Sequence, residues 1–128
     1  MNKYGNKKVI IDGIEFDSKL ESNRYCELKL MERAKIIKDL KLQVPFELIP
    51  SYRKKGKTVK ATKYIADFVY YDNEKKQQVI EDTKGVKTDV YKIKKKLFEY
   101  KYPDLEIVEI YEKGAKNDKR IRKINKRR

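Results

Sequence analysis

The sequence predicts an α/β domain in which helices flank a mixed central sheet. Short runs rich in β-branched and aromatic residues alternate with two segments of helical periodicity. Their order along the chain is hairpin, helix, three strands, helix and strand, and there is no internal repeat. A length of 128 residues fits a single core. We therefore expect one domain over residues 1–111 and a basic arm over residues 112–128.

A hairpin and a helix are expected first. Val9–Ile11 and Ile14–Phe16 flank Asp12-Gly13, a dipeptide typical of two-residue hairpin turns. The segment 18–21 (Ser-Lys-Leu-Glu) matches a capping box, so a helix should begin there and run to about Lys38. The apolar positions that share one face of this helix are Leu20, Leu28 and Met31.

Three strands should form the middle of the chain. Leu42–Ile49 is the first, and Pro45 within it indicates an edge position or a bulge. Tyr64–Tyr71 is the second, rich in aromatic and β-branched residues. The turn residues Asp72–Glu74 then lead into Gln77–Lys84, the third strand.

A second helix and a last strand complete the predicted domain. The helix should run from about Thr88 to Tyr100, and Pro103 closes that segment. The final strand is expected over Leu105–Tyr111. The apolar residues at helical spacing in this second helix are Val90, Ile93, Leu97 and Tyr100.

The charge balance indicates a polyanionic partner. Lys plus Arg number 34 against 20 Asp plus Glu, a net charge of +14. The excess is clustered in the segment 53–63, which contains no acid, and in the tail 112–128. Binding a polyanion through such clusters is favoured by counterion release, so we expect DNA as the partner. The candidate nucleic-acid contacts are Arg53, Lys54, Lys55, Lys57, Lys60, Lys119, Arg120, Arg122 and Lys123.

Composition excludes several kinds of chemistry. The chain has one cysteine and no histidine, which excludes an internal disulfide, a Cys/His zinc site and a histidine base. A catalytic metal must then bind to carboxylates, which points to Mg²⁺ or Mn²⁺. The first residues lack the apolar run of a signal peptide, and no stretch has membrane-spanning length, so we expect a cytoplasmic protein without a membrane partner.

Two neighbouring predicted strands carry the residues with catalytic potential. Residues two apart in a strand share a face, so Asp82 and Lys84 point the same way. If the turn has four residues, positions whose numbers add to 149 face each other, and Asp67 then lies opposite Asp82. A two-residue turn would put Asp67 opposite Ile80, still on the face of Asp82. Cross-strand neighbours are about 5 Å apart at Cβ, close enough for two carboxylates to share a divalent ion. Such a pair repels, and we expect a metal to relieve the repulsion and Lys84 to offset the rest.

At these residues the chain resembles the PD-(D/E)XK nucleases, whose motif is an acid on one strand followed by (D/E)-x-K on the next. Here the motif reads Asp67 and then Asp82-Thr83-Lys84, with Ala66 at the position of the motif's proline. The resemblance covers about residues 18–111 and is nearest to small phage or prophage proteins, Holliday-junction resolvases and transposon-end nucleases. It implies a restriction-endonuclease-like αβββαβ core in a protein of a bacterial host cell.

The resemblance also implies roles for individual residues. Asp67, Asp82, Lys84 and Glu21 would be catalytic. Metal contacts would come from Asp67, Asp82, Thr83 and Glu21, with Mg²⁺ or Mn²⁺ as the cofactor. A homodimer is expected if the substrate is a junction, because cutting a junction requires two active sites.

Several of these residues have plain structural alternatives. Glu21 is the glutamate of the capping box, and Asp82 could form a simple salt bridge with Lys84. Glu81 should face away from the site as a bystander, and it could replace Asp82 only if the strand register slips by one. Gln43 is either a polar neighbour of the site or an exposed strand residue. Tyr52, beside the basic segment, could stack on a base or a sugar.

Three functions compete on this evidence. The first is a Mg²⁺-dependent endonuclease that hydrolyses DNA, with branched or structured DNA in phage recombination or replication as the expected substrate. The second is a non-catalytic nucleic-acid-binding module on a nuclease-like scaffold. The third is an interaction protein whose tail binds acidic partners or membranes. The carboxylate pair favours the first, because a pure binder gains nothing from acids that face a phosphate backbone.

Overall fold

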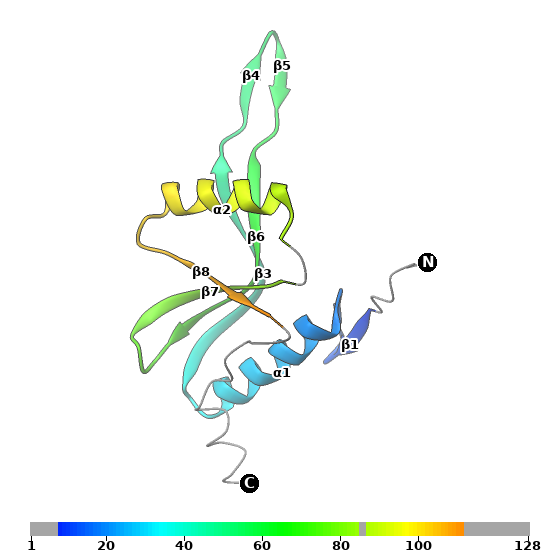
Figure 1. The fold of residues 1–128 in the computed structure, drawn as a ribbon, viewed down its shortest axis with the longest axis vertical. Coiled ribbons are helices and arrows are strands. Elements are labelled where there is room, and N and C mark those ends of the chain that lie inside the picture. The colour runs from blue at the N-terminus through cyan, green and yellow to red at the C-terminus, as the bar shows by residue number, and fades with distance from the viewer. Residues whose placement is uncertain (1–7, 85–86, 112–128) are drawn as a thin grey trace.

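A computed structural model describes residues 8–84 and 87–111, which fold into a mixed sheet with helices on both of its faces (Figure 1). The four-stranded sheet has the order β3-β6-β7-β8, and two hairpins, β1-β2 and β4-β5, lie outside it. The predicted α/β class with a mixed central sheet is confirmed. The elements are β1 (Val9–Ile11), β2 (Ile14–Phe16), α1 (Lys19–Arg33), β3 (Ile37–Ile49), β4 (Tyr52–Lys54), β5 (Lys57–Val59), β6 (Thr62–Asp72), β7 (Gln77–Thr83), α2 (Asp89–Lys101) and β8 (Ile107–Ile110).

The N-terminal hairpin forms as its turn chemistry predicts. β1 and β2 pair antiparallel, and both turn residues, Asp12 (φ 54°) and Gly13 (φ 76°), have positive φ, as a two-residue turn of this kind requires. The Ser18 hydroxyl accepts a hydrogen bond from the Glu21 N–H at 3.1 Å, so the predicted helix start is confirmed. This cap fixes the first turn of α1 beside the sheet.

The predicted end of α1 is wrong. The helix stops at Arg33, five residues before Lys38, and Lys35 adopts φ 62° in the turn that follows. β3 begins at Ile37, whose buried side chain packs in the core beside α1. Burial of Ile37 in the sheet therefore overrides the helix propensity of the preceding Ala and Lys residues.

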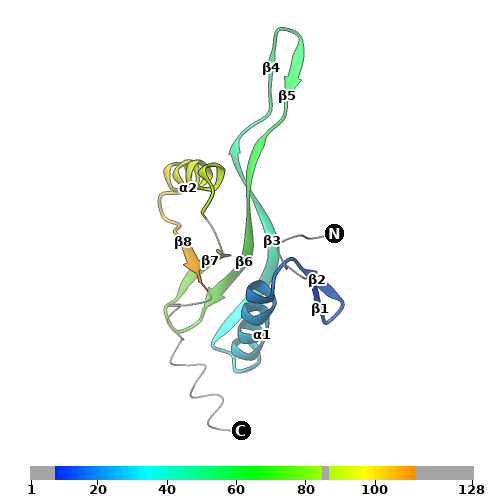
Figure 2. The ribbon, with the colours of Figure 1, turned by 45° about the vertical axis from the view of Figure 1, so that its right-hand side comes forward.

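β3 and β6 form a long antiparallel ribbon that extends well beyond the rest of the sheet (Figures 1 and 2). β3 is an edge strand, as Pro45 indicates, since a residue without an N–H is tolerated at an edge. Past the body of the domain, β4 and β5 continue the ribbon as a projecting hairpin. We call residues 52–60 of this hairpin the β-arm.

The strand register around the turn 73–76 agrees with the prediction. β6 ends at Asp72 and β7 begins at Gln77, leaving a turn of four residues, and Phe68 pairs with Glu81. β8 pairs with β7 in parallel, with Asp82 beside Glu109. This register places Asp67 and Asp82 at the point where β6 and β7 cease to pair.

The helices cover opposite faces of the sheet, as the two core clusters show. Val79 packs with the α1 cluster around Leu28 and Phe68, while its neighbour Ile80 packs with the α2 cluster around Phe98. Adjacent residues of one strand point to opposite faces, so α1 and α2 lie on the two sides of β7. Leu20, which we expected on the core face of α1, is only partly buried.

The apolar stripe predicted for α2 does not form its buried face. Tyr91 and Phe98 are buried instead, whereas Val90, Ile93 and Tyr100 are exposed and Leu97 is partly buried. The Phe98 ring packs within 5.5 Å of the Tyr64 ring and 5.2 Å of the Phe46 ring, centroid to centroid. Aromatic side chains bury more area than aliphatic ones, so this contact sets the rotation of the helix.

Candidate functional site

Asp67 lies where β6 and β7 separate. The ladder between these strands ends at the pair Phe68 and Glu81. One residue further on, the Asp67 Oδ2 atom accepts hydrogen bonds from both the N–H and the hydroxyl of Thr83, each at 2.8 Å. The side chain of Asp67 therefore links β6 to β7 where backbone pairing between the two strands has ended. Thr83 positions Asp67; its predicted metal contact stays a prediction.

A change of face in the β3-β6 ribbon coincides with this point. Leu42 of β3 packs with the α1 cluster, but Val44, two residues on, packs with the α2 cluster. Between them Gln43 has φ 52°, a left-handed conformation that breaks the simple alternation of a strand. On β6, Phe68 and Ala66 divide between the two clusters in the same way.

Gln43 links two of the predicted acids. Its Nε2 atom donates to Glu21 Oε2 at 2.9 Å and to Asp67 Oδ1 at 3.4 Å. Of the two interpretations of Gln43, the structure therefore favours a polar neighbour of the site. One neutral amide bridges two carboxylates that approach from the helix α1 and the strand β6.

Glu21 serves both as the capping-box residue and as part of the acidic site. Its N–H is capped by Ser18, while its side chain is 6% exposed and faces Gln43. Its Oε1 atom accepts from the N–H of Asp17 at 3.3 Å, so the reciprocal contact is displaced by one residue from the expected capping box. Burial, and then the nearby charge of Asp67, raise the pKa of Glu21 to about 7.

Asp82 and Lys84 form a contact network on the α2 side. Lys84 Nζ lies 2.9 Å from Asp82 Oδ1, and the Tyr64 hydroxyl donates to Asp82 Oδ2 at 2.6 Å. Burial raises the pKa of Asp82, as does the charge of Asp67, while the hydrogen bonds from Tyr64 and Lys84 oppose that shift. The salt bridge expected as the plain alternative is present, within a site that holds two further acids.

Tyr91 holds the ammonium group of Lys84 in place. Lys84 Nζ lies 3.6 Å from the centroid of the Tyr91 ring, a cation–π distance. The Tyr91 hydroxyl in turn donates to Glu109 Oε2 at 2.7 Å. Neither Tyr64 nor Tyr91 was singled out from the sequence, since ten tyrosines carry no local mark of such a role.

Glu81 faces away from the site, as expected. It is 1% exposed and accepts from Arg24 Nε at 2.7 Å and from Arg24 Nη2 at 2.6 Å. The Tyr70 hydroxyl also donates to it. This bidentate pair ties α1 to β7 directly behind Asp82, so Glu81 supports the site without entering it.

The acidic residues fit a divalent cation by charge and by donor chemistry. Glu21, Asp67 and Asp82 offer hard oxygen donors of the kind Mg²⁺ and Mn²⁺ prefer, and the charge of Asp67, after burial, contributes to the raised pKa of Glu21. Over residues 8–84 and 87–111, no three acidic or cysteine side chains converge closely enough to form a ready metal cage. The ligand set of Asp67, Asp82, Thr83 and Glu21 therefore remains a prediction.

The unusual pKa of Glu21 predicts a pH-dependent stability. The folded protein binds this proton more tightly than the unfolded chain, whose glutamate pKa is near 4.5. The extra stability is therefore complete below about pH 4.5 and is lost as the pH rises through about 7. In metal-free buffer we expect the melting temperature of the parent to fall across this range, and that of Glu21→Gln to fall less. Parallel curves for the two proteins would contradict the assignment.

The basic residues of the β-arm are exposed. In the described residues, no ion pair involves Lys54, Lys55, Lys57 or Lys60, and Tyr52 is about half exposed beside them. The other predicted nucleic-acid contacts, Lys119, Arg120, Arg122 and Lys123, lie outside the described residues.

The fold and the site together describe an α/β protein with an acidic cluster and a lysine where two central strands separate. The chain belongs to the family described as "Protein of unknown function (DUF1064)", whose match covers residues 1–124. Comparisons with curated proteins and with solved structures find no match. No helix in the described parts of the chain is long and apolar enough to span a membrane.

Proposed function

We propose that the protein is a metal-dependent endonuclease of the PD-(D/E)XK type that hydrolyses DNA. The observation that carries the proposal is that Asp67, at the point where β6 and β7 separate, interacts electrostatically with both Glu21 and Asp82, with Lys84 salt-bridged to Asp82 at 2.9 Å. The charge of Asp67 repels the carboxylates of both Glu21 and Asp82, and a divalent cation would relieve that repulsion.

The chain's own groups suit phosphodiester hydrolysis. A bound Mg²⁺ or Mn²⁺ would polarise the phosphate and lower the pKa of an attacking water. Glu21, Asp67 and Asp82 would hold it, and Gln43 and Thr83 would keep Asp67 oriented. Lys84, fixed between Asp82 and the Tyr91 ring, would direct the water or stabilise the charge that develops on the phosphate.

DNA as the substrate is supported by charge. The net charge of +14 favours a polyanion, and the unpaired lysines of the β-arm provide a surface for one. A non-catalytic nucleic-acid binder on the same scaffold is the second candidate, supported by that same surface. The buried acids favour the nuclease, because acids near a phosphate backbone would weaken simple binding.

Replacing Lys84 by alanine separates these two functions. We expect the cleavage rate to fall by about 10²–10³-fold, since one preorganised charge near the reacting phosphate is lost. DNA affinity should change little, because Lys84 is one of 34 basic residues and is mostly buried. Single-turnover cleavage and binding in Ca²⁺ measure the two quantities. An affinity loss as large as the rate loss would make Lys84 a simple phosphate contact.

A further inference from the structure

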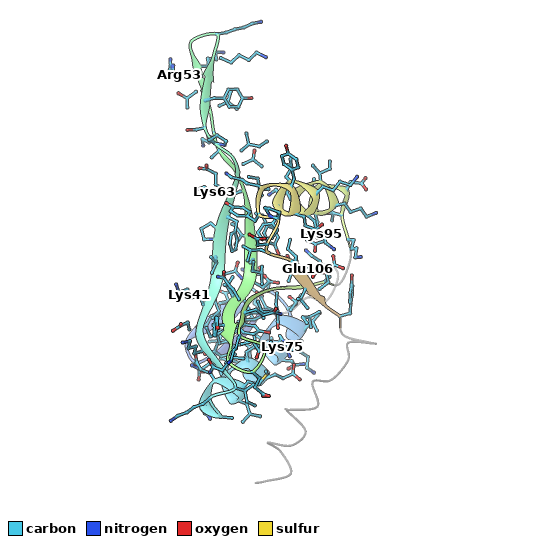
Figure 3. The ribbon with its side chains drawn as sticks, turned by 90° about the vertical axis from the view of Figure 1, so that its left-hand side faces the viewer. Lys41, Arg53, Lys63, Lys75, Lys95 and Glu106 are labelled. Carbon is cyan, nitrogen blue, oxygen red and sulfur yellow. The ribbon has the colours of Figure 1, made fainter. Side chains whose placement is uncertain are left out.

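The β-arm has no buried face and contributes no residue to the core clusters. Every residue from Tyr52 to Lys60 is exposed, and none belongs to either core cluster. A two-stranded hairpin without a buried face is marginally stable in water. Figure 3 shows the arm, with Arg53 near its end, projecting away from the body, whereas Lys75 lies at the opposite end of the sheet.

The arm also contains repulsion between like charges, which a bound anion would relieve. Lys54 and Lys57 are directly opposite each other in the register, and like charges in such pairs destabilise a hairpin. No acidic residue lies in the chain between Glu47 and Asp67 to compensate them. Other described lysines, such as Lys29 and Lys101, lie within 4 Å of a carboxylate.

The two faces of the arm differ. Cross-strand pairs share a face, so Tyr52, Lys54, Lys57 and Val59 lie on one side. On the other side, Arg53 donates to the Thr58 hydroxyl at 3.0 Å and to the Gly56 carbonyl at 2.6 Å. Arg53 thus stiffens the tip, and the opposite face offers two free ammonium groups beside an aromatic and an aliphatic side chain.

We infer that the β-arm enters the major groove of duplex DNA at a distance from the site of cleavage. A two-stranded ribbon fits the major groove of B-DNA, about 12 Å wide, where lysines reach phosphates and apolar side chains contact base edges. This inference rests on the proposed function in one respect, that DNA is the substrate. It goes further by naming the form of DNA: a double helix extending from the site along the ribbon.

The length of the β3-β6 ribbon sets the distance between the acidic site and the β-arm. Asp67 and Thr58 lie on one continuous stretch of chain about nine residues apart, and a strand rises about 3.3 Å per residue. The arm therefore lies roughly 30 Å from the acidic site, and at about 3.4 Å per base pair this corresponds to about nine base pairs. A duplex much shorter than this could not contact the site and the arm together.

The test is binding to DNA duplexes of increasing length, measured without a cleaving metal so that it does not depend on catalysis. We compare the parent with Lys54→Gln/Lys57→Gln and with Lys75→Gln/Lys76→Gln, a control with the same charge change in the exposed turn at the other end of β6. The parent and the control should gain affinity as the duplex exceeds about ten base pairs, and the arm variant should lose that gain. Its slope of log affinity against log salt should flatten by about 1.8, or about 0.9 for each lost phosphate contact.

Other outcomes overturn the inference. Equal losses in the two double variants would mean that only net charge matters. An equal length effect with single-stranded DNA, or with double-stranded RNA, whose deep and narrow major groove excludes a ribbon, would rule out the groove. Because the substituted residues are exposed, melting temperatures should match, and a large drop would mean that the arm serves folding. Duplex-dependent binding without any cleavage would support the arm while contradicting the nuclease, so the two failures are distinguishable.

Discussion

Asp82→Asn is expected to lower the rate of DNA cleavage by at least about a hundredfold while leaving DNA binding intact or tighter. The substitution removes the charge that a divalent cation requires but keeps a side chain able to contact Tyr64 and Lys84. Losing one preorganised electrostatic group in an active site typically costs 10²–10³ in rate. Binding should hold or improve, because one negative charge near the phosphates is gone.

The matched control is Asp104→Asn, the same chemical change in an exposed turn before β8. Single-turnover rates and duplex affinities of both variants, alongside their melting temperatures, separate catalysis from folding. If Asp82→Asn cut DNA at the parental rate, Asp82 would not be part of the chemistry. A rate loss shared by Asp104→Asn would indicate a general charge effect instead.

The largest effect on stability is expected from Arg24→Ala. Glu81 is 1% exposed, and its charge is balanced by the bidentate contact with Arg24. Removing one partner of a buried ion pair leaves the other uncompensated and typically costs about 3–5 kcal/mol. A domain of this size has only about 5–15 kcal/mol in total, so much of the protein should unfold at modest denaturant concentration.

Lys29→Ala provides the comparison, because Lys29 lies on the same helix and pairs with Glu32 at the surface. The free energy of unfolding lost in Lys29→Ala should be within about 1 kcal/mol. Urea titration of both variants gives the two free energies of unfolding. Replacing Arg24, Glu81 and Tyr70 together by Met, Leu and Phe should recover most of the loss, since no buried polar group then lacks a partner. An Arg24→Ala loss as small as that of Lys29→Ala would show that water already solvates Glu81.

The parts of the fold predicted correctly are those with local determinants. Asp12-Gly13 fixes one hairpin through its positive φ angles, and the four-residue turn 73–76 fixes the register of β6 with β7. That register places Asp67 next to the last pair of the ladder, Phe68 and Glu81, and so close to Asp82. The capping box at Ser18 marks the start of α1 in the same local way.

The errors lie where tertiary contacts decide. Nothing near Arg33 signals a helix end, because Ala34 and the following lysines are good helix formers, and the stop depends on the burial of Ile37. The rotation of α2 likewise depends on Phe98 meeting rings from β3 and β6. Both the burial of Ile37 and the ring contacts of Phe98 depend on residues far apart in the sequence, so local sequence patterns do not predict them.

The network around the acids was only partly predictable for the same reason. The motif identifies Asp67, Asp82 and Lys84, but not Tyr64, which contacts Asp82 from β6, or Tyr91, which meets Lys84 through the packing of α2 on the sheet. The hydrogen bonds from Gln43 to the two acids require a left-handed backbone conformation in the middle of a strand. A glutamine in the sequence does not predict that conformation. Strain of this kind at a site is typical of functional positions.

We propose that the acids around Asp67 would hold a divalent cation and that the site hydrolyses DNA only when that cation is bound. The most direct measurement is the initial rate of cleavage of end-labelled branched and linear DNA by the parent protein, first treated with EDTA and then titrated with Mg²⁺ or Mn²⁺. We predict no cleavage in EDTA and a saturable rise in rate with metal on at least one of these DNA forms. Cleavage that persists in EDTA, or no cleavage of any form at saturating Mg²⁺ and Mn²⁺ despite DNA binding, would contradict the account.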